Sequence, residues 1–122
     1  MKCDIYFSQF DTSEINAKGW GCEEGDLLLR LTNPLGEDGS IRALDEALDK
    51  GKYRFVGSLD LEDADHAWLV VQNIDERHPL NDRSMMVGDV VICDKKIGKI
   101  VEPMGWSDLS QEQINKFENF IY

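Results

Sequence analysis

Long apolar segments are absent from this sequence. No stretch of its 122 residues approaches the roughly 18 to 20 apolar residues that a membrane-spanning helix requires. Residues 1–7 also lack the long apolar stretch of a secretion signal. We therefore expect a protein that stays in the cytoplasm of the cell that makes it.

Cysteine and histidine are both scarce. Cys3, Cys22 and Cys93 are odd in number and lack Cys-x-x-Cys spacing, so neither a disulfide framework nor a zinc site is predicted. We expect them to be small apolar side chains, buried or half-buried. Of the two histidines, His66 lies in an acidic predicted helix and His78 lies in a loop before a proline. Neither position indicates a nucleophile paired with its base. The sequence predicts no enzyme.

Motifs for metal ions and phosphates are also missing. The acidic residues at 60–65 lack the glycine and the distal glutamate of a calcium-binding loop. The glycines of Gly19-Trp20-Gly21 are followed by Cys-Glu-Glu, which places negative charge where a phosphate would have to lie. We therefore expect no metal and no cofactor.

Basic residues are few relative to acidic ones. The chain holds 13 Lys and Arg against 24 Asp and Glu, a formal charge of -11, which repels nucleic acid and anionic membranes. Residues 1–65 carry 15 acids and 7 bases, whereas residues 66–122 carry 9 and 6. The acidic face is expected in the first half of the chain.

The pattern of apolar residues predicts an α+β fold, with a small, mostly antiparallel sheet and about three helices in a single domain spanning residues 1–122. Strands are predicted at 2–7, 27–31, 53–59, 86–93 and 97–101. Helices are predicted at 41–50, at 61–73 and from Ser110 onward, and Met104-Gly105-Trp106 is predicted as a turn.

The stretch Arg83-Ser84-Met85-Met86-Val87-Gly88-Asp89-Val90-Val91 predicts a turn that opens a buried strand. Gly88 permits a bulge that turns Asp89 toward backbone groups and toward Arg83. The structural interpretation is that Asp89 pairs with Arg83. The alternative is a contact with a ligand or a partner.

Residues 53–122 resemble a family of small bacterial, phage and plasmid proteins of unknown function, the YodL-type family. The motifs that carry the resemblance are Phe55-Val56, Trp68 with Gln72-Asn73-Ile74-Asp75, the stretch 83–91, and Val101-Glu102-Pro103-Met104-Gly105-Trp106. Met86 stands where the family usually has serine, and Trp106 where it usually has phenylalanine. The resemblance implies a mobile-element setting and no particular mechanism, and residues 1–52 are unmatched.

Two kinds of side chain are candidates for binding a partner. Carboxylates at phosphate-like spacing can occupy the cleft of a nucleic-acid-binding protein, and loop tryptophans are contact points. The alternatives are a solvated acidic face and aromatic side chains that cap the core. The candidate residues are Glu37, Asp38, Asp45, Glu46, Asp49, Asp60, Glu62, Asp63, Asp65, Trp20 and Trp106.

The favoured hypothesis is a non-enzymatic binding protein of a phage or mobile element. It would present its carboxylates to a basic host protein and inhibit a nucleic-acid-binding or defence protein, without touching nucleic acid or membrane itself. The alternative is a small-molecule or peptide-binding domain, with Trp20, Trp106 and the turn at 83–89 forming a pocket beside the last hairpin. An enzyme with an unfamiliar site is the third hypothesis.

Overall fold

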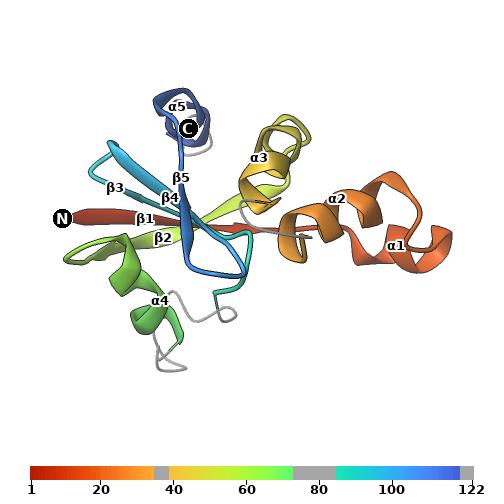
Figure 1. Cartoon of the computed structure of the whole chain (residues 1–122), viewed down its shortest axis with the longest axis horizontal. Coiled ribbons are helices and arrows are strands. Elements are labelled where there is room, and N and C mark those ends of the chain that lie inside the picture. Colours follow the sequence, from red (N-terminus) through yellow and green to blue (C-terminus); the bar gives the residue numbers. More distant parts are fainter. Residues whose placement is uncertain (35–38, 73–84, 119–122) are drawn as a thin grey trace.

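The computed structural model describes residues 1–34, 39–72 and 85–118, and it confirms an α+β fold with one antiparallel sheet (Figure 1). The strands are β1 (Lys2–Ser8), β2 (Tyr53–Asp60), β3 (Val90–Cys93), β4 (Ile97–Val101) and β5 (Trp106–Asp108). The helices are α1 (Thr12–Lys18), α2 (Glu23–Thr32), α3 (Gly39–Asp49), α4 (Ala64–Gln72) and α5 (Gln111–Glu118). The described residues thus form five helices, two more than the sequence predicts.

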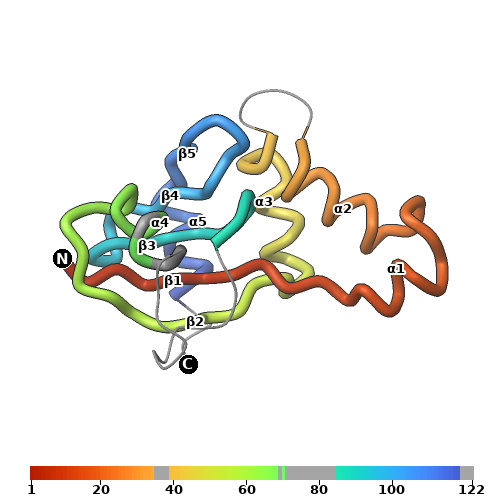
Figure 2. Tube along the Cα trace, turned by 90° about the horizontal axis from the view of Figure 1, so that it is seen from below, coloured from red at the N-terminus to blue at the C-terminus, as the bar shows by residue number. Residues whose placement is uncertain are grey.

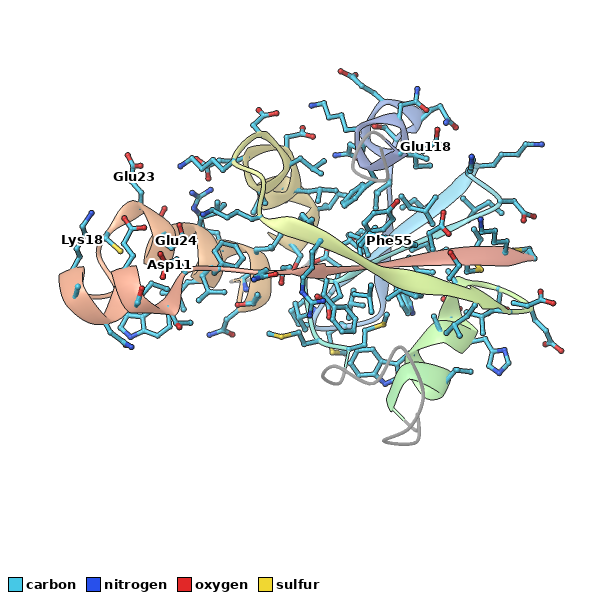
Figure 3. The ribbon with its side chains drawn as sticks, turned by 180° about the vertical axis from the view of Figure 1, so that it is seen from behind. Asp11, Lys18, Glu23, Glu24, Phe55 and Glu118 are labelled. Carbon is cyan, nitrogen blue, oxygen red and sulfur yellow. A yellow bond between two sulfur atoms is a disulfide. The ribbon has the colours of Figure 1, made fainter. Side chains whose placement is uncertain are left out.

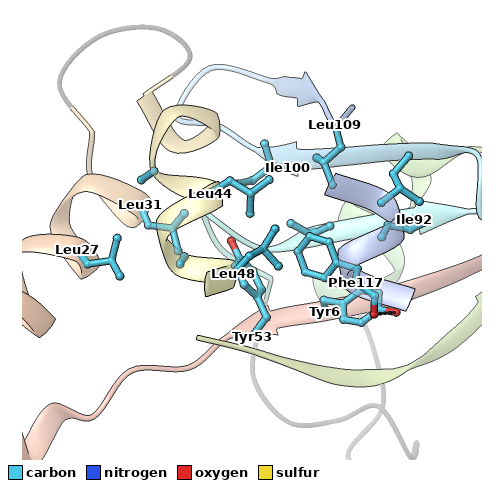
Figure 4. Close-up of a cluster of buried hydrophobic side chains, with 14 residues drawn as sticks. Tyr6, Leu27, Leu31, Leu44, Leu48, Tyr53, Ile92, Ile100, Leu109 and Phe117 are labelled. Carbon is cyan, nitrogen blue, oxygen red and sulfur yellow. Dashed lines mark hydrogen bonds between the residues drawn. The ribbon is translucent and has the colours of Figure 1, made fainter. Parts of the chain in front are cut away.

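The sheet has the order β2-β1-β3-β4-β5, so β1 lies at its interior between β2 and β3. Successive side chains of a strand point to opposite faces, and each face is covered by helices. Tyr6 and Val90 pack in one cluster with α2, α3 and α5, whereas Ile5 and Val91 pack in the other with α4. Figure 1 shows α3 and α5 on one side of the sheet and α4 on the other, and Figure 4 shows the first of these clusters.

The strand predicted at 27–31 is wrong, because these residues belong to α2. Leu27 and Leu31, one helical turn apart, are buried, whereas Leu29 between them is 39% exposed. The acidic first turn and Arg30 in the last turn suit the helix dipole. Leucine favours helices, while the β-branched residues typical of strands are missing from the run. A short apolar run alone does not separate a buried strand from a helix.

Cys3 and Cys93 form a disulfide, which corrects the prediction that the chain has none. The two residues lie directly opposite each other in the antiparallel pair β1 and β3, with Cα atoms 4.0 Å apart and no exposed area. Cys22 is free and half-buried, and its Sγ caps α2 by accepting a hydrogen bond from the Gly25 N–H. The expected burial is therefore confirmed, but Cys3 and Cys93 are covalently joined.

The turn before β3 places Asp89 against backbone N–H groups, as the sequence predicts, while its predicted pairing with Arg83 stays a prediction. Gly88 has a φ of +95°, a conformation that disfavours side chains, and a Cβ there would lie 3.1 Å from Leu31 Cγ. Asp89 is fully buried and accepts hydrogen bonds from the backbone N–H groups of Met86 and Ser8. The predicted strand 86–93 therefore begins only at Val90, and Arg83 lies outside the described residues.

A buried carboxylate connects the last hairpin to α3. Glu102 follows β4 and is 5% exposed, and its oxygens accept from the backbone N–H groups of Ser40 at 2.8 Å and Ile41 at 3.1 Å. Ser107 donates to the same carboxylate from β5, a strand that the sequence does not predict. The N-terminus of α3 is thus capped by a residue from the opposite half of the sequence.

The α1 and α2 helices form a hairpin that lies at one end of the molecule (Figures 1 and 2). Glu24, which is 6% exposed, connects it to the residue before β2 by accepting from Lys52 Nζ at 2.6 Å, and it also accepts from the Asp11 N–H. Figure 3 shows Asp11 and Glu24 close together at this end. No helix among residues 1–34, 39–72 and 85–118 combines the length and apolar character needed to cross a membrane.

Candidate functional site

The candidate carboxylates do not form one surface. Asp45, Glu46 and Asp49 lie on α3, which packs on one face of the sheet. Asp60, Glu62, Asp63 and Asp65 lie where β2 leads into α4, whose Ala64 and Ala67 pack on the other face. Glu37 and Asp38 lie outside the described residues. The sheet itself therefore separates the two acidic groups.

The carboxylates of α3 are held by neighbouring side chains. Glu46 pairs with Arg30 of α2 and lies 3.9 Å from Lys50 Nζ. Asp49 lies 3.8 Å from Lys116 Nζ, and Asp45 accepts a hydrogen bond from Gln113, so both connect α3 to α5. These charges contribute to helix packing and are partly neutralised there.

The group that we name the α4 acidic corner, Asp60, Glu62, Asp63 and Asp65, has fewer partners. Asp60 pairs with the amino group of Met1 at 3.1 Å. Asp63 accepts from the His66 N–H at 2.8 Å and so caps the first turn of α4. Glu62 and Asp65 are exposed and form no ion pair with any residue in the described part of the chain.

The two candidate tryptophans lie apart. Trp20 is 56% exposed in the turn between α1 and α2, at the end of the molecule away from β5 (Figures 1 and 2). Trp106 lies on β5 and packs against the cluster beneath α4. The pocket that the sequence predicts from Trp20, Trp106 and the turn at 83–89 therefore does not include Trp20.

A cavity that does not involve Trp20 forms beside the last hairpin. It has a volume of about 300 Å³ and joins α4, the turn before β3 and the β4–β5 hairpin. Its lining residues are Trp68, Val87, Val101, Glu102, Pro103, Gly105 and Trp106. The Glu102 carboxylate itself is engaged by α3 and Ser107, so aromatic and aliphatic groups supply the contacts that a ligand would meet.

The buried ionisable groups hold the fold together. Burial raises the pKa of Glu24, but the hydrogen bonds from Lys52 and from the Asp11 N–H together lower it by more, so the pKa lies below its ordinary value. Burial, together with Asp89 and Glu102, raises the pKa of Tyr53, whose hydroxyl donates to the Gly88 carbonyl at 2.5 Å. Among the described residues, no three His, Cys, Asp or Glu side chains are placed to hold a metal ion.

Sequence reasoning misses a second hollow, between α2 and α3. It includes Arg30 and Arg42, and it depends on α2 being a helix, because a strand would point the adjacent Leu29 and Arg30 to opposite faces, whereas both line this hollow. The periodicity of residues 23–32 is the signal that could have found it.

Comparison with protein-family models, with curated proteins and with solved structures gives no match to this chain. The resemblance of residues 53–122 to the YodL-type family therefore stays a prediction from the quoted motifs.

Proposed function

We propose that the protein is a non-catalytic binding protein that presents carboxylates to a basic partner. In the setting that the family resemblance implies, the partner is a host nucleic-acid-binding or defence protein, which it inhibits. The observation that carries the proposal is the α4 acidic corner, where Glu62 and Asp65 are exposed and unpaired within the described part of the chain.

Charge supports this choice of partner. With 24 acidic and 13 basic residues, the protein attracts basic surfaces over long range. The carboxylates of α3 are held by Arg30, Lys116 and Gln113, so a partner would have to displace these groups to use them. At the α4 acidic corner a partner would displace fewer groups, because within the described part of the chain Asp60 and Asp63 are the members that have partners.

The test is capture of a partner from host lysate at physiological salt, using the wild-type chain and two matched charge reversals. Glu62→Lys with Asp65→Lys should abolish capture, whereas Asp45→Lys with Asp49→Lys should retain it. Raising the salt concentration should weaken capture by the wild type, because exposed charges are screened. Capture that is equal for all three proteins would refute the proposal.

A second candidate function rests on the cavity beside the last hairpin, which is large enough for a small aromatic ligand or an apolar peptide side chain. A ligand bound there would contact Trp68 and Trp106, which both line the cavity. A thermal-shift screen of small aromatic compounds tests it: a stabilisation that Trp106→Ala abolishes and Trp20→Ala retains would favour the pocket.

A further inference from the structure

The groove between α2 and α3 is a second place where the fold leaves room for a ligand. The two helices pack side by side (Figures 1 and 2), and a cavity of about 520 Å³ lies between the end of α2 and the start of α3. This volume falls within the range of small-molecule sites. The residues that line it are Leu29, Arg30, Asn33, Pro34, Gly39, Arg42 and Ala43.

One wall of the groove is apolar. Leu29 is 39% exposed, although the neighbouring Leu27 and Leu31 of the same helix are buried, and its side chain lines the hollow. Buried Ala43 and half-buried Pro34 extend this wall. A ligand that covers Leu29 would remove apolar surface from water, which favours binding.

The polar groups of the groove differ in how far they are engaged. Arg30 pairs with Glu46, and its Nε donates to Asp26 at 2.9 Å, so its charge is balanced within the protein. Arg42 is exposed and forms no ion pair with a described residue, although Lys18, Lys52 and Lys116 each hold a carboxylate.

The backbone N–H groups at the N-terminus of α3 would not bind an anion in the groove. Those of Ser40 and Ile41 already donate to Glu102, so they offer nothing to a ligand. Among the described lining residues, the side-chain donor groups that have no partner in this part of the chain are the Asn33 amide and the Arg42 guanidinium. Only the guanidinium is charged, with a planar fork that matches a carboxylate or a phosphate.

We propose that the α2–α3 groove binds a small molecule that joins an anionic group to an apolar body. The anion lies on the Arg42 guanidinium, and the apolar body lies against Leu29, Pro34 and Ala43. Binding in this groove is independent of the α4 acidic corner, which lies on the other face of the sheet and would bind a positively charged partner.

The probe is 4-phenylbutyrate, with its neutral amide and inorganic phosphate as comparisons, titrated into the ¹⁵N-labelled full chain. We expect saturable shifts of the amides of residues 29–33 and 39–43, with a dissociation constant on the order of a millimolar for a ligand of this size. The amide should bind about tenfold more weakly, because it lacks the charge-assisted bond. Phosphate should also bind more weakly, because it lacks the ring.

Arg42→Gln should reduce the affinity for phenylbutyrate to that of the amide, while Arg42→Lys should keep part of the preference for the acid. Lys96→Gln, which removes another exposed base on the β3–β4 turn, is the control and should bind like the wild type. Arg42 is exposed, so its variants should fold, as circular dichroism can check. Equal affinity for acid and amide, shifts elsewhere on the chain, or undiminished binding by Arg42→Gln would each overturn the assignment.

Discussion

Glu102 Oε1 lies 2.8 Å from the backbone nitrogen of Ser40, a residue 62 positions earlier in the chain. A helix normally takes its N-terminal cap from the residue just before it. Here the cap of α3 comes from the end of β4, so helix and hairpin hold each other in place. The carboxylate therefore has a structural role, although it also borders the cavity beside Trp106.

Removing this cap should destabilise the protein. Glu102→Ala leaves the Ser40 and Ile41 N–H groups without their acceptor, and we expect a loss of about 2 kcal/mol in the free energy of unfolding. Glu102→Gln should cost less, because its amide oxygen still accepts. Urea denaturation measures both. Asp108→Ala is the control, since its exposed pair with Lys99 should contribute less than about 0.5 kcal/mol.

A side chain at Gly88 should destabilise the protein. Its φ of +95° and the 3.1 Å approach of Leu31 predict that Gly88→Ala lowers the free energy of unfolding by about 2 kcal/mol. Gly21→Ala is the matched control, because a Cβ at that position would meet no atom within 4 Å and its φ is not positive. A similar midpoint in urea for both variants would contradict the interpretation of the turn.

The disulfide predicts a definite thiol count. Unfolded but unreduced protein should react with iodoacetamide at Cys22 alone, and reduced protein at all 3 cysteines, as mass spectrometry can show. Reduction should lower the free energy of unfolding by about 2 to 4 kcal/mol, because it releases a long closed loop. Cys22→Ser should leave this loss unchanged. Labelling of Cys3 and Cys93 before reduction would show that the bond is absent.

The buried pair of Glu24 and Lys52 predicts a dependence of stability on pH. The folded state lowers the pKa of Glu24 below its ordinary 4.5, so it favours the ionised form. The stabilisation is therefore present above pH 4.5 and is lost as the pH falls through the lower folded value. Urea denaturation should show that Glu24→Gln is less stable than the wild type at pH 7 and that the difference shrinks in acid.

A matched control for this prediction is Glu14→Gln. Glu14 pairs with Lys18 on the exposed side of α1, and such pairs contribute little. Its effect on the free energy of unfolding should stay below about 0.5 kcal/mol. An equally large effect of both substitutions at neutral pH would mean that burial does not distinguish the two pairs.

The sequence predicts most strands and the three helices that have clear apolar stripes. Helix α3 follows from the spacing of Ile41, Leu44 and Leu48, and β1 from its alternation. The sequence does not predict helix α2, because four leucines within five residues suit either a helix or a buried strand. Its packing against α3 in the folded protein favours the helix. The disulfide is invisible for another reason: Cys3 and Cys93 meet only through the register of β1 with β3.

The candidate site is predicted less well than the fold. Composition identifies exposed carboxylates, but only the topology shows that Asp45 and Asp65 belong to different faces of the sheet. Likewise, Trp20 and Trp106 look alike in sequence, since each lies beside a glycine. Their separation depends on the α1–α2 hairpin, whose helices the sequence does not predict.

The interior position of β1 has a consequence for how this chain could be recombined. Residues 53–122 supply four strands of the sheet, but β2 reaches β3 only through β1. Transplanted without residues 1–52, they would leave the edge of β3 open and Glu102 without the helix that it caps. Residues 53–122 are thus not a transferable unit, and any protein into which they are inserted must supply a strand in the place of β1.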